Sequence, residues 1–230
     1  KVNGNTVDVI LDGVQKINRA YGSSIADGEV GIGNRATDTV FDDFRVSRPS
    51  LLPYSENFDD GVDDLFQRNL GTWVVNGAGR YVGKKGINGR TVSVVPIEDD
   101  LVGLDVIEIN ATAKTREVLG QGKNAFIVYD YIDENNFKFA GLWDGIDQWK
   151  MGRYKNGQWI FNASLDEVID TDVEYNLTVR IDNTTFTTTL FVNGVEKLSY
   201  QYLGNLLNGD MGLGTKNADS VFDNFQIVSA

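Results

Sequence analysis

The side chains available for acid–base catalysis in this chain are carboxylates, tyrosines, lysines and arginines, because its 230 residues include no histidine and no cysteine. Ser-His-Asp and Cys-His systems are therefore excluded, and a zinc site would lack its usual ligands. Asp170, Asp172 and Glu174 alternate, so on a strand they would share one face, and paired carboxyl groups are what glycoside hydrolysis needs. These acids stand just before an alternating segment that starts at Tyr175, however. We therefore expect an acidic turn and no catalytic residues.

Aromatic residues gather between positions 143 and 161, where three of the four tryptophans lie. Aromatic rings suit the apolar C–H faces of sugars, and nearby carboxylates and amides suit their hydroxyl groups. We expect Trp149 and Trp159 to pack in the core, and Trp143 and the acidic loop after it to be exposed. The predicted carbohydrate-binding residues are therefore Trp143, Asp144, Asp147 and Tyr154.

The charge of the chain limits its partners. Lysine and arginine total 21 against 33 aspartates and glutamates, which gives a net charge of −12. Nucleic acids and anionic membranes attract basic surfaces, so neither is an expected partner. The chain also lacks the run of about 18 apolar residues that a membrane-spanning helix needs, and we expect no membrane insertion.

The chain is a series of short strands joined by tight turns. Residues 106–115 alternate apolar and polar side chains, as a strand with one buried face does. Asn193-Gly194 and Asp12-Gly13 each separate two strand-like runs, and both pairs favour two-residue hairpin turns. No segment shows a convincing helical period. The pattern predicts an all-β fold, a sandwich of two antiparallel sheets.

An internal repeat is present at a spacing of 181 residues. Residues 6–46 align without a gap onto residues 187–227, and 13 of these 41 positions are identical. Chance would give roughly two or three identities, so the match indicates a repeated structural unit. The closing run Val40–Phe44 of the first copy corresponds to Val221–Phe225 of the second.

The repeat predicts two domains of unequal completeness. Residues 49–230 have the length of one whole copy, and residues 1–48 match only the C-terminal part of a copy. The boundary lies in the connector Ser47–Pro53, which holds two of the three prolines. So short a fragment cannot bury its own apolar face. We expect it to be completed either by upstream chain or by another subunit.

Three segments carry a resemblance to known domains: the run NAFIVYDYIDENNFKFAG at residues 124–141, the hairpin from Trp149 to Trp159, and the closing run Phe222–Phe225. Together they resemble bacterial laminin-G-like, concanavalin A-like lectin and glucanase domains over residues 55–228. The resemblance implies a two-sheet jelly roll whose concave face often holds glycans. Glucanases of this fold use a Glu-x-Asp-x-Glu strand, whereas the corresponding run here starts with Asp170.

Many relatives in the resembled family carry a structural calcium ion. In that fold the first and last strands pair, which would bring residues 55–60 and 221–225 to one edge. Calcium takes about six to eight oxygen ligands, and the predicted ligands here are Glu56, Asp59 and Asp223. The alternative is that these acids are solvated or cap backbone amides.

Three functions are compatible with these observations. The first is a non-catalytic module of a large repetitive bacterial surface protein or adhesin, extracellular, binding a glycan or a neighbouring subunit. The second is a carbohydrate-binding accessory domain, or a glycosidase-like domain, of a polysaccharide-degrading enzyme. The third is a structural repeat of an extracellular fibre. The first is the one the tandem copies, the acidity and the resemblance favour.

Overall fold

The computed structural model describes residues 2–3, 5–23, 31–36, 38–42, 50–86, 89–119 and 122–230. The chain divides into two compact units, Lys1–Pro49 and Ser50–Ala230. Each unit is built from antiparallel strands, and the second holds the large hydrophobic core.

The first unit contains one small sheet, with β1 (Val2–Asn3), β2 (Thr6–Leu11) and β3 (Val14–Ala20) in that order. Its hairpin reproduces β15 (Thr187–Val192) and β16 (Val195–Gln201), whose bounds lie 181 positions further on at both ends of both strands. The register shift in each hairpin falls at the corresponding place, between Val9 and Ile10 and between Leu190 and Phe191. The strand expectation is confirmed for this hairpin.

The turns of the two hairpins also agree. Asp12 and Gly13 have φ angles of 51° and 75°, and Asn193 and Gly194 have 49° and 79°. All four residues are in the left-handed region, which Asp, Asn and Gly tolerate better than other residues and which the two-residue turn requires. The local sequence therefore determines this geometry in both units.

The rest of the first unit differs from its counterpart. Residues 31–36 and 38–42 form no strand, although they correspond to parts of β17 (Asp210–Lys216) and β18 (Ser220–Ser229). In the second unit, β17 pairs with β8 (Arg90–Val95) and β10 (Ala125–Asp133). β18 pairs with β4 (Tyr54–Glu56), β7 (Tyr81–Lys84) and β9 (Val106–Thr115). Among the described residues of the first unit there are no equivalents of these partner strands. A strand without a neighbour has no ladder of hydrogen bonds to hold it extended.

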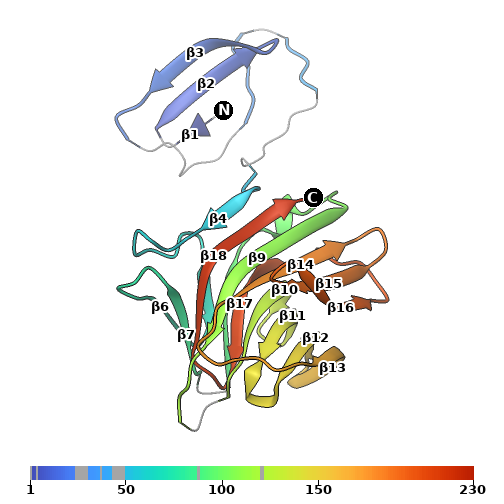
Figure 1. Ribbon diagram of the computed structural model, residues 1–230. Coiled ribbons are helices and arrows are strands. Elements are labelled where there is room, and N and C mark those ends of the chain that lie inside the picture. Colours follow the sequence, from blue (N-terminus) through green and yellow to red (C-terminus); the bar gives the residue numbers. More distant parts are fainter. Residues whose placement is uncertain are drawn as a thin grey trace. The chain divides into compact units, whose positions relative to one another are not determined.

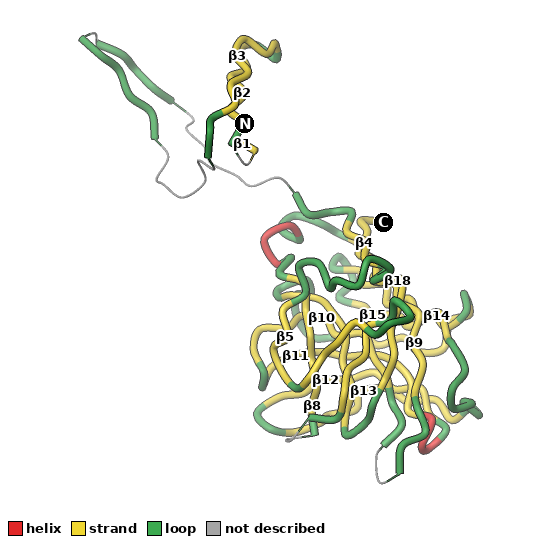
Figure 2. Tube along the Cα trace, turned by 90° about the vertical axis from the view of Figure 1, so that its left-hand side faces the viewer, coloured by secondary structure: helices red, strands yellow, loops and turns green. Residues whose placement is uncertain are grey.

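Two antiparallel sheets make up the second unit (Figures 1 and 2). The seven-stranded sheet runs in the order β13 (Gln158–Asp166), β12 (Gln148–Lys155), β11 (Asn136–Trp143), β10 (Ala125–Asp133), β17, β8 (Arg90–Val95) and β5 (Gln67–Leu70). The eight-stranded sheet runs in the order β16, β15, β14 (Tyr175–Asp182), β9 (Val106–Thr115), β18, β7 (Tyr81–Lys84) and β6 (Thr72–Val75), with β4 (Tyr54–Glu56) beside β18. The first strand of the unit therefore pairs with the last, as the resemblance to a known fold implies.

The core lies between the two sheets. Alternation along β9 turns Ile107, Ile109 and Ala111 inward, into the same buried cluster as Ile127 and Trp149 of the facing sheet. Trp149 is 2% exposed, which confirms its predicted place in the core. The only helices in the described residues are two short 3₁₀ turns, Glu98–Asp100 and Asp144–Ile146. No helix in this part of the chain has the length and apolar character needed to cross a membrane.

The all-β, two-sheet jelly-roll prediction is confirmed. Strands of both sheets alternate between a side chain in the core and one on the opposite face. That opposite face of the seven-stranded sheet carries the candidate site.

Candidate functional site

A second hydrophobic cluster covers the outer face of the seven-stranded sheet, the face that points away from the core. We call it the outer aromatic face. Along β10 and β11, residues of the core alternate with residues of this cluster, so the strand period itself divides the side chains between the two faces. The cluster consists of Val92, Val94, Phe126, Val128, Tyr131, Phe137, Phe139, Trp143 and Tyr154, with Leu70 and Trp159 packed against it.

Glycines allow the rings of this face to lie flat on the sheet. A Cβ atom on Gly214 would stand 2.3 Å from Cε2 of Phe126, and one on Gly152 would stand 3.0 Å from Cζ of Phe139. Because neither glycine has a side chain, each ring occupies the space above the backbone. Phe126 also stacks on Trp143, with ring centroids 5.4 Å apart and planes 8° apart.

Two aromatic side chains at the edge of the face reach solvent. Trp159 of β13 is partly exposed, and its ring packs 5.0 Å from that of Phe139. Phe161, two residues further along the same strand, is 41% exposed and meets Trp143 edge-on at 6.0 Å. The prediction that Trp159 packs in the core is wrong. Its strand is the outermost of the sheet, and its ring lies on the outer side.

Two lysines lie over these exposed rings. The amine of Lys216 is 5.0 Å from the ring centroid of Trp159, and that of Lys150 is 4.2 Å from that of Phe161. Burial lowers the pKa of Lys216. Burial lowers the pKa of Lys150 as well, and the charge of Lys216 adds to that effect. Such contacts are cation–π interactions, worth about 0.5–1 kcal/mol at exposed sites.

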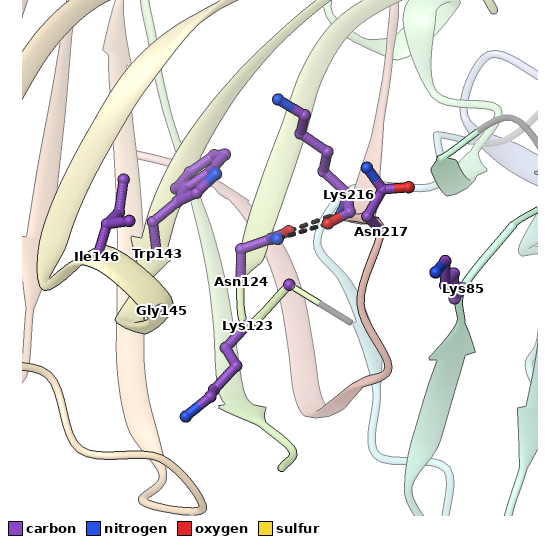
Figure 3. Close-up of a pocket in the computed structure, with 9 residues that line it drawn as sticks. Lys85, Lys123, Asn124, Trp143, Gly145, Ile146, Lys216 and Asn217 are labelled. Atoms are coloured by element: carbon purple, nitrogen blue, oxygen red, sulfur yellow. Dashed lines mark hydrogen bonds between the residues drawn. The ribbon is translucent and has the colours of Figure 1, made fainter. Parts of the chain in front are cut away.

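A pocket of about 600 Å³ adjoins these lysines (Figure 3). Its rim is held by Asn124, whose amide donates to the backbone oxygen of Lys216 at 2.6 Å and accepts from its backbone N–H at 2.7 Å. The side chains of Lys216 and Lys123 extend from this rim in opposite directions in the view of Figure 3. The lining residues are Lys85, Gly122, Lys123, Asn124, Trp143, Gly145, Ile146, Lys216 and Asn217.

The four predicted carbohydrate-binding residues are placed differently from one another. Trp143 lines the pocket but is only 6% exposed, so the expectation of an exposed ring is wrong. Asp144 is buried and accepts a hydrogen bond from the hydroxyl of Thr115. Asp147 accepts the backbone N–H of Ile169 at 3.0 Å, and Tyr154 stacks within the outer aromatic face.

Sequence reasoning missed Phe161 and Lys216 as parts of this surface. The alternation of Trp159 and Phe161 was a usable signal, because residues two apart on a strand share a face. Lys216 gave no such signal. It reaches the same place from β17, which is separated from β12 by two other strands of the sheet.

The predicted calcium ligands contact other groups of the protein, and Asp59 accepts a hydrogen bond from the side-chain amide of Asn57 at 2.9 Å. Both carboxylate oxygens of Glu56 accept backbone N–H groups, from Phe58 at 2.7 Å and from Asp64 at 3.1 Å. Asp223 forms an ion pair with Arg80. Across the described ranges no group of three or more metal-ligating side chains comes together. In this arrangement other groups of the protein already contact Glu56 and Asp223, and calcium binding at this edge stays a prediction.

The alternating acids lie in the expected turn. Residues 167–174 form no strand, and Asp172 has a φ of 60°, which belongs to a turn. Glu174 lies 3.8 Å from the amine of Lys114. Asp170, Asp172 and Glu174 therefore do not share the face of a strand.

No family model matches the sequence, and no curated protein sequence matches it. Solved structures do match in fold. The carbohydrate binding module CBM66 from Bacillus subtilis has a TM-score of 0.61 at 17% identity, over 72% of this chain and 96% of that one. The Emp47p carbohydrate recognition domain has a TM-score of 0.55 at 13% identity, over 77% and 95% of the two chains. The basic winged bean lectin solved with Tn-antigen also scores 0.55, at 9% identity over 76% and 97%. The fold is therefore that of a lectin-like β-sandwich.

Proposed function

We propose that residues 50–230 are a carbohydrate-binding module and that the outer aromatic face is its binding surface. The observation that carries the proposal is the aromatic cluster on the sheet face opposite the core, which ends in the partly exposed Trp159 and Phe161 beside a pocket of about 600 Å³. An exposed apolar patch next to polar groups is the usual form of a ligand site. The fold shared with proteins named as a carbohydrate binding module, a carbohydrate recognition domain and a lectin supports it.

The surface fits sugars for a physical reason. The rings of Trp159 and Phe161 offer flat apolar area to the C–H face of a pyranose, and Asn217 and the lysines at the pocket offer hydrogen bonds to its hydroxyl groups. The rings beneath them are held by stacking and glycine contacts, so little side-chain entropy is lost on binding. The affinity is modest, since an open surface buries few contacts completely.

The module acts without catalysis in this proposal, as an extracellular, laminin-G-like unit of a repetitive surface protein. The absence of histidine and cysteine from the chain and the position of Asp170, Asp172 and Glu174 in a turn support it. The matching hairpins of the two units support the tandem arrangement, in which residues 1–48 are the C-terminal part of a copy. A neighbouring subunit as ligand is the alternative partner.

The glycan proposal is tested by screening the whole chain on an array of polysaccharides. We expect binding that Trp159→Ala weakens at least about tenfold, since truncating a tryptophan that anchors a binding surface costs about 2 kcal/mol or more. Tyr21→Ala, which removes an aromatic ring 48% exposed in the first unit, is the matched control and keeps the affinity. Equal binding by the wild type and Trp159→Ala, or no glycan bound by either, would contradict the proposed surface.

The tandem proposal is tested by exchanging the hairpins. Residues 6–20 replace residues 187–201, so that Val9 and Leu11 take the places of Leu190 and Val192 in the core. Both pairs are apolar, and the turn and register shift are the same. We expect a cooperatively folded chimera that keeps glycan binding. A chimera that is unfolded would show that the two hairpins are not equivalent, provided that the unmodified chain folds under the same conditions.

A further inference from the structure

We propose that the ligand of the outer aromatic face is an acidic glycan, whose carboxylate or sulfate groups are recognised by Lys150 and Lys216. The inference rests on the proposed function and specifies its substrate class. It is carried by the positions of the two amines over the exposed rings, 4.2 Å from the ring centroid of Phe161 for Lys150 and 5.0 Å from that of Trp159 for Lys216.

Lys150 and Lys216 are distinguished by their position over the exposed rings of Phe161 and Trp159. Among the described residues, Arg68, Arg80, Lys114, Lys123, Lys138, Arg180 and Lys197 each have a carboxylate within 4.0 Å. Lys150 and Lys216 belong to none of the ion pairs found in that part of the chain. In a chain with 33 acids against 21 bases, these two neighbouring cations place a local positive charge on this face, which the charge of Asp166 offsets in part at Lys150.

Their placement costs stability in the free protein. Both amines are partly buried, which lowers the pKa of each, and each amine also repels the other. An anionic group at this place would relieve the repulsion and form charge-assisted hydrogen bonds with both amines. A neutral sugar would leave the repulsion between the two amines in place, so the site favours the acidic ligand.

The geometry lets one sugar residue satisfy both kinds of contact. A sugar that packs against the exposed parts of Trp159 and Phe161 has its substituents beside the amines, because each amine lies over one of these two aromatic rings. Lys216 also lines the adjoining pocket, together with Lys85 and Lys123. A further acidic group of a polymer can therefore approach Lys216 from this pocket.

Lysine rather than arginine fills both positions. An ammonium group is a compact charge that can donate hydrogen bonds to a carboxylate or to a sulfate, whereas a guanidinium group favours planar, bidentate partners. Carboxylate and sulfate are both anions whose oxygens accept hydrogen bonds, and either would fit the two amines. The experiment below distinguishes the two groups.

The test measures affinity of the whole chain for four polymers by affinity electrophoresis or calorimetry. They are polygalacturonate for carboxylates, chondroitin sulfate for sulfates, dextran as a neutral glycan, and single-stranded DNA as a non-glycan polyanion. We expect one acidic glycan to bind at least about tenfold more tightly than dextran and DNA, with an affinity that falls as salt rises.

The variants assign the effect to the two lysines. Lys150→Met with Lys216→Met should abolish the preference for the acidic glycan, and Lys150→Arg with Lys216→Arg should retain it. Lys84→Met removes the same charge from an exposed position at the end of β7, in the other sheet, and should change nothing. Tryptophan fluorescence melting confirms that each variant is folded.

The outcomes separate this inference from the proposed function. Binding of neutral glycans with no acidic preference, or an acidic preference unchanged in the double methionine variant, would overturn the inference and leave the proposed function standing. DNA bound as tightly as the acidic glycan would show charge attraction alone and would also overturn it. Failure to bind any glycan would remove the proposed function and the inference together.

Discussion

Substituting Gly214 by alanine should disturb the outer aromatic face from beneath. The new Cβ would stand 2.3 Å from Cε2 of Phe126, about 1 Å short of ordinary van der Waals contact at 3.4–4 Å. The ring cannot move away freely, since it is fully buried and packs against Phe139, Trp143 and Trp159. Overpacking of this kind costs about 1–3 kcal/mol.

The assay is thermal unfolding of the whole chain, followed by tryptophan fluorescence. This signal reports the second unit alone, because all four tryptophans lie in it: Trp73, Trp143, Trp149 and Trp159. For a unit of this size the melting midpoint falls by about 2–4 °C per kcal/mol, so Gly214→Ala should lower it by about 2–12 °C. Glycan affinity should fall as well, because a displaced Phe126 shifts the stacked ring of Trp143.

Gly204→Ala is the matched control, since a Cβ atom there meets nothing within 4 Å. It should leave the free energy of unfolding within about 0.5 kcal/mol of the wild type. The double variant Gly214→Ala with Phe126→Leu should recover part of the loss in melting midpoint, because it removes the ring with which the new Cβ atom clashes. Equal midpoints for the two alanine variants, or additive effects of Gly214→Ala and Phe126→Leu, would refute the account of rings lying flat on glycines.

Three further outcomes are expected. Lys138→Met should lower the free energy of unfolding by about 3–5 kcal/mol, because it leaves the buried carboxylate of Asp130 without its cation. Fluorescence melting measures this loss. A smaller loss in the double variant Asp130→Asn with Lys138→Met would assign the effect to the ion pair. Burial raises the pKa of Tyr131 to about 12, so the folded chain holds this proton more tightly than the unfolded chain and loses the associated stability as pH rises above about 10. An absorbance titration of the folded protein should show tyrosines that ionise well above pH 10. A single transition near pH 10 would contradict this expectation. If calcium binds, a hundredfold excess over its Kd adds about 2.7 kcal/mol to the free energy of unfolding. At the predicted edge the ion must displace Arg80 from Asp223. Melting with and without a chelator measures the effect, and an unchanged midpoint would count against calcium.

Much of the fold could be predicted because its determinants are local. The alternation in residues 106–115 became β9, with its odd-numbered apolar residues in the core. Asp12-Gly13 and Asn193-Gly194 became turns with positive φ angles, which depend on those residue types and on little else. The pairing of the first strand with the last followed from the resemblance to a known fold.

The candidate site could be predicted only in part. The aromatic run at residues 143–161 does contribute most of one surface, and Trp149 is in the core as expected. The exposures of Trp143 and Trp159 were the reverse of the expectation, however. Exposure depends on what covers a ring, and here neighbouring strands cover Trp143 while β13 forms the edge of its sheet.

The sequence by itself determined the strands, the turns and which side chains share a face of each strand, because the two-residue period and the turn residues act over short distances. It could not say which of two apolar faces would meet the other sheet, since β10 and β11 carry large apolar side chains on both. Only the tertiary structure decided that Lys150 and Lys216 meet over the rings of Trp159 and Phe161. Those residues come from three strands, and their proximity depends on the order of strands in the sheet, which no local pattern encodes.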